Sequence, residues 1–232
     1  MAQTTNLTDL EKKLHLKFNQ PHLIANAFVH RSYLNESKEF TQSNERLEYL
    51  GDAVLELVTS VFLFNRYPQY QEGMLTNLRA SLVKTSTLAQ LALELGLDKH
   101  LLMSKGEEEH GGRKNQSILA DTTEALLGSI YLDQGLSAVE RILTTYLFPK
   151  TEEIINNLEY KDSKSLLQEI AQSKYKATPI YQLISETGPD HNKEFIMQVV
   201  INNRKYAQGK GKSKQAAQEE AAKRTLELIK NN

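Results

Sequence analysis

Residues 44–64 read NERLEYLGDAVLELVTSVFLF and decide the fold of the first part of the chain. At about 100° per residue, Glu45, Glu48 and Asp52 fall within one sector of about 60°. The opposite face is apolar and carries Leu47, Leu50, Val54, Leu57, Val58 and Val61. The stretch therefore predicts an amphipathic helix with an acidic stripe. A solvated face is the simplest explanation of such a stripe, but few Lys or Arg residues stand four positions away to offset its charge.

Residues 117–135 read SILADTTEALLGSIYLDQG and predict a second helix, which is buried. Asp121 and Glu124 stand three positions apart and share a face, yet apolar residues flank that face and line the opposite side. Two carboxylates on a buried helix are unfavourable unless a cation compensates them. Gly128, one turn beyond Glu124, leaves room for a ligand or another helix to approach closely.

Packing the two acidic faces together would bring Glu48, Asp52, Asp121 and Glu124 into one region, with Glu45 at its margin. Like-charged carboxylates raise one another's pKa unless a metal ion neutralises them. Because the ligands are all oxygen and neither helix offers a histidine, a hard cation, Mg²⁺ or Mn²⁺, is favoured over zinc. Such a site is typical of phosphoryl transfer. The residues alone leave one alternative open, in which Asp121 or Glu124 pairs with a buried arginine such as Arg79.

The hydrophobic pattern changes near Leu158, and this change divides the chain. Helical spacing holds from Leu7 to that point, with a predicted helix end at Gly96 and a predicted loop over residues 105–116. The remainder predicts helix, strand, strand, strand, helix, which is a small α+β unit. Its expected features are a helix N-cap at Asp162 or Ser163, strands at 180–186, 195–201 and around 205–208, turns at 187–193 and 202–203, and a last helix capped by Ser213. The predicted segments are residues 5–149, a linker at 150–160, and residues 161–231.

The composition agrees with two modest domains. Among 232 residues, 40% are hydrophobic and none is cysteine, which excludes disulfides, Cys-ligated zinc and thiol nucleophiles. No apolar stretch approaches the roughly 18 residues of a membrane span, and the first residues lack a signal-peptide pattern, so we expect a cytosolic protein without a membrane partner.

Charge is divided unevenly between the two parts. Residues 1–155 carry 15 basic and 20 acidic side chains, whereas residues 156–232 carry 13 basic and 9 acidic ones. Between Phe195 and Gln218 there is no acidic residue, and the basic ones are Arg204, Lys205, Lys210, Lys212 and Lys214. This run indicates polyanion binding, or else a solvated basic strand and turn.

The motif NERLEYLGDAVL at residues 44–55 resembles the defining motif of the ribonuclease III family. The resemblance continues at 72–83, at 105–113 and at 118–135, and covers most of residues 7–149. It implies an all-α endonuclease domain in which Glu48, Asp121 and Glu124 ligate the catalytic Mg²⁺. By the same resemblance, Asp52 is an essential carboxylate, and Glu45 contributes to a second or outer metal position.

The family resemblance also implies an assembly and a product. Tyr49 stands where family members have an aromatic residue that docks into the other subunit, which implies a homodimer. The family's dimer holds two sites that each cut one strand of an RNA duplex, leaving 5′-phosphate and a short 3′ overhang.

Residues 162–229 resemble a double-stranded-RNA-binding domain along their whole length. In that family the first helix and the loop between the first two strands contact successive minor grooves of A-form RNA, which assigns Gln168, Glu169 and His191 to this role. The start of the last helix meets the phosphates in that family, and Lys212 and Lys214 suit this role at a helix start whose free N–H groups favour anions. Lys210 is expected to bind RNA as well. Gln215 departs from the pattern, because family members often have a lysine there.

Two weaker signals are set aside. Gly211-Lys212-Ser213 is similar to the end of a phosphate-binding loop, but Tyr206 stands where that loop requires glycine, so no nucleotide cofactor is expected. The remaining histidines show no metal-ligand spacing and are expected to be structural or surface residues: His15, His22, His30, His100 and His110.

The sequence thus predicts a cytoplasmic, Mg²⁺-dependent endoribonuclease, with Mn²⁺ as a substitute, that acts on double-stranded RNA. The resemblance implies ribosomal RNA precursors and structured messenger RNAs as substrates. The main alternative is a non-catalytic dimeric double-stranded-RNA-binding protein. A helical metal hydrolase of small phosphate esters is disfavoured, because it leaves the basic second unit without a role.

Overall fold

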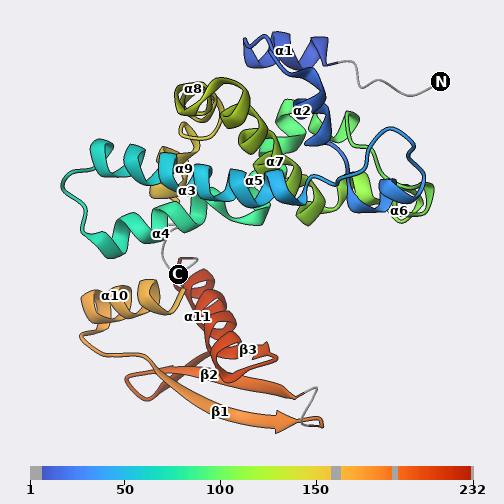
Figure 1. Cartoon of the computed structure of the whole chain (residues 1–232). Helices are drawn as coiled ribbons and strands as arrows, with labels where there is room; N and C mark the ends of the chain where they lie inside the picture. Colours follow the sequence, from blue (N-terminus) through green and yellow to red (C-terminus); the bar gives the residue numbers. More distant parts are fainter. Residues whose placement is uncertain (1–6, 158–162, 190–192, 231–232) are drawn as a thin grey trace. The chain divides into compact units, whose positions relative to one another are not determined.

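The computed structural model describes residues 7–157, 163–189 and 193–230, which form two compact units, Met1–Tyr160 and Lys161–Asn232 (Figure 1). The helices of the first unit are α1 (Thr8–Leu14), α2 (Pro21–Asn26), α3 (Glu45–Arg66), α4 (Glu72–Val83), α5 (Thr85–Leu95), α6 (Lys105–Glu109), α7 (Gln116–Gln134), α8 (Leu136–Tyr146) and α9 (Lys150–Asn156). Short 3₁₀ helices are η1 (Arg31–Asn35), η2 (Leu97–Lys99) and η3 (Gly112–Lys114). The second unit contains α10 (Ser163–Tyr175), β1 (Ile180–Thr187), β2 (Glu194–Ile201), β3 (Arg204–Gly211) and α11 (Lys214–Lys230). The predicted fold class, all-α followed by α-β-β-β-α, is confirmed.

The long helices α3 and α7 form the centre of the first unit. Every residue of α7 from Ile118 to Ile130 is buried except Asp121 and Glu124, which are partly buried, so the prediction of a buried helix is correct. α5 packs on another side of α7, with Leu88, Leu91 and Ala92 completely or almost completely buried.

Two glycines allow the backbones of α3 and α7 to touch. A Cβ atom placed on Gly51 would lie 1.7 Å from the carbonyl oxygen of Glu124, and one placed on Gly128 would lie 2.3 Å from the carbonyl oxygen of Leu47. No residue larger than glycine fits at either position unless one helix moves. The room that Gly128 was predicted to leave is therefore occupied by α3.

α3 leaves part of its apolar surface exposed. Leu57 and Val61, which the pattern placed on the core face, are 53% and 49% exposed. Leu47, Val54 and Val58 belong to the sector of α3 that packs inward. Leu57 and Val61 lie beyond the edge of that sector. The apolar face predicted opposite the acids is therefore only partly buried.

Two predicted irregular stretches contain short helices. Residues 105–116, predicted as a loop, include α6 and η3, because Ser104 caps α6 by accepting a hydrogen bond from the Glu107 N–H (3.2 Å). Arg113 then ties the stretch to the preceding residues by donating to the carbonyl oxygens of Asp98 (2.8 Å) and Leu101 (3.0 Å). Within the segment predicted as a linker, residues 150–156 form α9, which buries Thr151 and Ile154.

The second unit is an antiparallel sheet in the order β1-β2-β3, with α11 packed against β2 and β3. Asn202 and Asn203 both have positive φ (48° and 61°) and form the predicted tight turn between β2 and β3. β3 is longer than predicted, running over eight residues instead of the four around 205–208. Ser213 caps α11 as predicted, accepting from the Ala216 N–H at 3.1 Å, whereas Asp162 lies outside the described residues.

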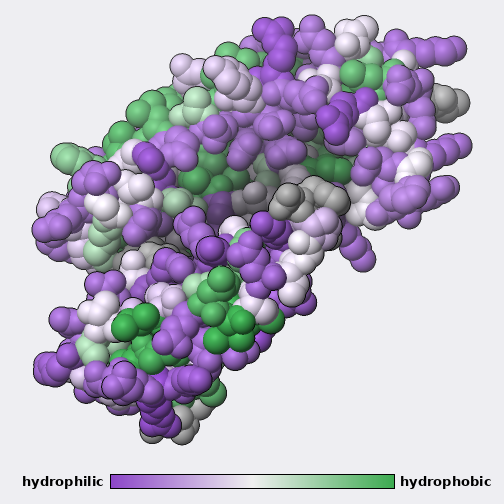
Figure 2. All heavy atoms as spheres, turned by 90° about the horizontal axis from the view of Figure 1, so that it is seen from below, coloured by the Kyte–Doolittle hydropathy of each residue, from purple (hydrophilic) through white to green (hydrophobic). Residues whose placement is uncertain are grey.

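Apolar side chains are also exposed on the sheet. In β1, Ile180, Leu183 and Ile184 are between 44% and 61% exposed. Figure 2 shows that hydrophilic residues cover most of the face in view and that separate hydrophobic groups interrupt them. Over the described residues, no helix combines the length and the apolar character that a membrane crossing needs.

Candidate functional site

Three carboxylates meet where α3 and α7 cross. Glu48 comes from α3, and Asp121 and Glu124 come from α7, and one oxygen of each lies within 4.8 Å of the others. The contact between Gly51 and Gly128 is what permits this, because short acidic side chains reach one another only across closely spaced backbones. The arrangement offers an all-oxygen ligand set, which suits a hard divalent cation.

Burial and mutual repulsion make this cluster hold protons when no cation is present. Burial raises the pKa of Glu124 to about 8, with further contributions from the charges of Asp52, Asp121 and Glu48. Burial and neighbouring acids also raise the pKa of Glu48. For Asp121, burial raises the pKa, and nearby His30 and Arg31 oppose that rise. A cation in the cluster would take the place of these protons.

The other two predicted carboxylates lie outside this group of three. Asp52, one turn after Glu48, is exposed, but it is close enough for its charge to raise the pKa of Glu124. Glu45 is held at the start of α3, where its carboxylate accepts a hydrogen bond from Ser43 Oγ (2.7 Å) and lies 3.9 Å from Arg31 Nη1.

The alternative in which an arginine neutralises the cluster is not found. Arg79 forms an ion pair with Glu56 (Nε to Oε2, 2.7 Å) and donates a hydrogen bond to Ser60 Oγ. Among the described residues, no lysine or arginine forms an ion pair with Glu48, Asp121 or Glu124. Within the described ranges, the three carboxylates are therefore not neutralised by an ion pair.

Two residues beside the cluster escaped the sequence analysis. His30, set aside as structural or surface, lines a polar pocket of about 390 Å³ together with Arg31, Glu48 and Asp121. Asn44, 4% exposed, holds this region together, because its main-chain N–H donates to Val29 O (2.8 Å) and its side chain donates to Ala27 O (3.3 Å). Asn44 is the first residue of the motif at 44–55, but the motif gave it no role, and the polar character of His30 beside an apolar segment is too common to be diagnostic.

An exposed apolar stripe runs along α3 beside the acids. It consists of Tyr49 (82% exposed), Leu57, Val61 and Phe64 (71% exposed). At about 100° per residue these four side chains fall within one sector of about 120°. Tyr49 also borders a hollow of about 1120 Å³ between α2, residues 39–42 and the start of α3. We call these four residues the α3 stripe.

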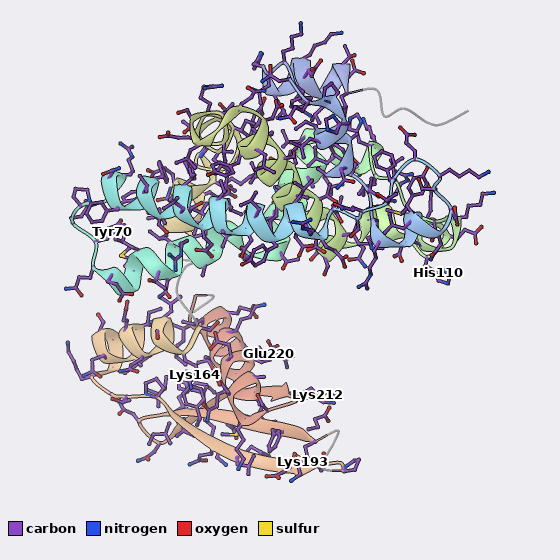
Figure 3. The ribbon with its side chains drawn as sticks, in the orientation of Figure 1. Tyr70, His110, Lys164, Lys193, Lys212 and Glu220 are labelled. Carbon is purple, nitrogen blue, oxygen red and sulfur yellow. The ribbon has the colours of Figure 1, made fainter. Side chains whose placement is uncertain are left out.

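In the second unit, the predicted phosphate-contacting lysines gather at one end of the sheet. Lys210 and Lys212 are at the end of β3 and Lys214 begins α11, and all three are exposed. Figure 3 shows Lys193 and Lys212 at this same end, with Lys164 of α10 farther along the unit. Gln168 and Glu169 are exposed on α10, whereas His191 lies outside the described residues.

Two of these lysines form ion pairs with carboxylates. Lys210 Nζ lies 2.8 Å from Glu194 Oε2, and Lys214 Nζ lies 3.8 Å from Glu186 Oε2. Glu186 also accepts a hydrogen bond from Lys193 (3.1 Å). Exposed ion pairs contribute little stability, so a phosphate can compete for these lysines.

Known proteins resemble both units. Residues 20–151 match the family model described as Ribonuclease-III-like, and residues 163–229 match the double-stranded RNA binding motif. The chain belongs to the ribonuclease III family. A protein named Ribonuclease 3 from Syntrophobacter fumaroxidans is 46% identical over 99% of this chain and 97% of its own length. Another from Geobacillus thermodenitrificans is 43% identical over 96% of this chain and 90% of its own length. The nuclease domain of ribonuclease III from Campylobacter jejuni, a solved structure, covers 62% of this chain and 99% of its own at 39% identity, with a TM-score of 0.58.

Membership makes the chain a ribonuclease, as predicted. Ribonuclease III enzymes depend on a metal ion, and Glu48, Asp121 and Glu124 form the group of described residues whose oxygens converge closely enough to hold one. The double-stranded RNA binding motif coincides with the unit that carries the basic run.

Without a bound metal, this ribonuclease should lose folding stability as the pH rises from about 5 to 8. The pKa of Glu124 is about 8 in the folded chain against an ordinary 4.5, so the folded state binds more protons in this range. This contribution is fully present below about pH 4.5 and is lost as the pH rises through 8. Solvent screening reduces the effect to about 1–2 kcal/mol, or roughly 3–6 °C in Tm.

Differential scanning fluorimetry in EDTA, in a series of buffers from pH 5 to 8, measures how Tm depends on pH. Glu124→Gln should flatten the Tm profile, and Mg²⁺ should raise Tm most at high pH, where it competes with the fewest protons. A Tm that rises from pH 5 to 8 in EDTA would contradict the assigned proton binding.

Proposed function

We propose that this ribonuclease is a cytoplasmic, Mg²⁺-dependent endonuclease that hydrolyses double-stranded RNA to products with 5′-phosphates and short 3′ overhangs. Ribosomal RNA precursors and structured messenger RNAs are the proposed substrates, and Mn²⁺ is a substitute metal. The observation that carries the proposal is the group of three carboxylates, within 4.8 Å of one another and without a lysine or arginine counter-ion in the described chain. The second unit adds the double-stranded RNA binding motif. The proposed domains are residues 5–149 and 161–231, joined by 150–160.

Each carboxylate has a proposed task. Glu48, Asp121 and Glu124 hold the metal, which when bound polarises the phosphate and lowers the pKa of water. Their placement on two helices whose backbones touch fixes the geometry before RNA arrives, which avoids reorganisation during the reaction. Asp52, exposed beside them, is placed to accept a proton or share ligation, and Glu45 serves the outer position near Arg31.

A denaturing-gel assay on a long perfect RNA duplex tests the proposal. We expect fragments of discrete size in Mg²⁺ or Mn²⁺, no fragments in EDTA, and no cutting of a single strand of the same sequence. Retained duplex binding with no metal-dependent cleavage would establish the non-catalytic binding protein instead. Turnover of a small phosphate ester that persists unchanged after removal of residues 159–232 would favour the small-ester hydrolase.

For the second unit we propose contacts along one duplex face. Gln168, Glu169 and His191 are assigned to minor grooves, and Lys210, Lys212 and Lys214 to the phosphates between them. The exposure of the three lysines and their position at one end of the sheet support this assignment.

Replacing Glu186 should strengthen RNA binding. Its carboxylate interacts with both Lys193 and Lys214, and a phosphate must displace it from them. We expect Glu186→Gln to bind duplex RNA about 2–5-fold more tightly, which corresponds to about 0.5–1 kcal/mol, with a steeper salt dependence. Fluorescence anisotropy at several salt concentrations, in EDTA, measures both quantities.

Glu220→Gln is the matched control for this substitution. Glu220 is as exposed as Glu186 and pairs with Arg224 on α11 at 2.7 Å, so its removal changes the net charge equally. An equal gain in both variants would show that net charge, and not release of the sheet-end lysines, determines the affinity.

The proposed assembly is a homodimer formed by a second copy of the α3 stripe. The stripe is continuous and strongly exposed, and the hollow beside Tyr49 can receive an aromatic side chain from the other copy. Sedimentation velocity at micromolar concentration should show a dimer for the wild type and a monomer for Tyr49→Glu, since burying that charge is costly. Phe40→Glu, at the rim of the hollow, should act in the same direction. A dimer that survives both substitutions would place the interface elsewhere.

A further inference from the structure

One ring nitrogen of His30 is used in hydrogen bonds that hold the local backbone. Nδ1 lies 3.3 Å from the main-chain N–H of Ser32 and 2.8 Å from Ser32 Oγ, at the start of η1. Because a main-chain N–H can only donate, Nδ1 must accept, and the ring hydrogen is therefore on Nε2. Ser32 Oγ is itself fixed, since it accepts a hydrogen bond from the Ser104 N–H at 3.0 Å.

The other edge of the ring carries a donor toward the acidic pocket. With Nδ1 turned to η1, the Nε2 edge is left to line the pocket that Glu48 and Asp121 share. Within the described part of the chain, no residue forms a hydrogen bond with Nε2. Arg31, which also lines the pocket, is 74% exposed and lies 3.9 Å from Glu45, so it is less suited to hold a metal ligand.

The charges around this edge favour a carboxylate as the acceptor. The pocket is bordered by the carboxylates Glu45, Glu48, Glu107 and Asp121, by the cation Arg31, and by His30. His30 and Asp121 both line this pocket, so the ring N–H and the carboxylate share one space. An excess of acids makes the pocket a poor place for a second anion, and a good one for an N–H that donates to an acid.

We propose that His30 is a positioning residue: its Nε2–H, which has no hydrogen-bond partner among the described residues of the metal-free chain, would donate to the Asp121 carboxylate when a metal is bound and fix which oxygen that ligand presents to the metal. Protein groups that hydrogen-bond a metal ligand orient it, and their loss typically lowers metal affinity about 10–100-fold. The inference rests on the proposed metal site and deepens it. The path Ser104 N–H, Ser32 Oγ, His30, Asp121 connects the start of α6 to the metal ligand on α7.

Two substitutions separate this role from a structural one. In His30→Asn, the amide oxygen can replace Nδ1 as the cap of η1, but nothing replaces Nε2–H. In His30→Gln, the longer side chain brings an amide N–H to the place of Nε2 and loses the cap. If His30 positions the metal ligand, the His30→Gln variant retains metal affinity and the His30→Asn variant loses it. A purely structural role predicts the reverse.

The readout is direct Mn²⁺ binding to the full chain by electron paramagnetic resonance of the free ion, without RNA. We expect His30→Asn to bind about 10–100-fold more weakly than wild type, and His30→Gln to stay within about threefold of it. Arg31→Gln should bind as tightly as wild type or more so, because it removes a nearby cation without touching Nε2. Tm measurements on all variants report any damage to the fold.

The possible results are distinct. Wild-type affinity in His30→Asn, or equal losses in the Asn and Gln variants, would overturn the positioning role while leaving the metal site intact. If the wild type itself binds no Mn²⁺, or binds it as well after Glu124→Gln, the proposed metal site fails, and the role of His30 fails with it.

Discussion

Replacing Glu124 by glutamine is expected to lower duplex cleavage by at least about 10³-fold, which is on the order of 4 kcal/mol of transition-state stabilisation. Glu124 is one of the three converging ligands and the one whose carboxyl has a pKa raised to about 8, so its charge is the most strongly confined to the protein interior. Glutamine keeps the shape and one oxygen but removes the charge that attracts a divalent cation. The measurement is single-turnover cleavage of a labelled duplex over a series of Mg²⁺ concentrations.

Binding and stability separate a chemical effect from a folding effect. Duplex affinity in EDTA should be unchanged, because the predicted RNA contacts lie in the second unit. Without metal, the Tm of Glu124→Gln should be equal to or higher than that of wild type at pH 8, since a repelling, partly buried charge has been removed. Glu153→Gln, exposed on α9, is the matched control and should cleave normally. Cleavage by Glu124→Gln within tenfold of wild type would exclude Glu124 as a metal ligand.

The sequence was sufficient to predict the helices that carry the acids, for a clear physical reason. Glu48, Asp121 and Glu124 sit in periodic segments, and a half-buried acid on an otherwise buried helix stands out against its apolar neighbours. Their convergence depends on the crossing of α3 and α7, which periodicity does not specify. Gly128 indicated a close approach, but not which surface meets it, and the part played by Gly51 is seen only in the structure.

The features that the sequence could not predict depend on tertiary hydrogen bonds and on how much of each apolar helix face the rest of the fold covers. His30 is held by Leu102 and by Ser32, and Asn44 is held by Ala27 and Val29. No local pattern encodes such contacts. Leu57 and Val61 satisfy the apolar pattern of a core face, yet they are 53% and 49% exposed. Likewise, the sequence from Phe195 to Gln218 contains no acid, so it gave no sign that two of its lysines are paired. In the structure, Lys210 pairs with Glu194 and Lys214 with Glu186, and both acids come from neighbouring strands.

Gly51→Ala is the substitution expected to damage the fold most. The added Cβ would lie 1.7 Å from the Glu124 carbonyl oxygen and 3.0 Å from the Gly128 nitrogen, and both contacts are backbone atoms of a buried helix that cannot rotate away. Relief requires α3 and α7 to separate, which opens the core on both sides of the crossing and draws Glu48 away from Asp121 and Glu124. We expect destabilisation by at least about 4 kcal/mol, at the upper end for a single substitution, seen as loss of soluble protein or a strongly lowered midpoint in urea.

Gly73→Ala shows why the effect belongs to the crossing and not to glycine itself. Gly73 is the second residue of α4, and a Cβ there would meet no atom within 4 Å. Alanine is also the better helix former, so this variant should be as stable as wild type or more stable by about 0.5–1 kcal/mol. The same mutation therefore has opposite signs at two helical positions, and the difference comes from the proximity of the Glu124 main chain. If Gly51→Ala instead folds with the wild-type midpoint and cleaves RNA normally, the two helices do not cross in backbone contact, and the carboxylates need another explanation for their convergence.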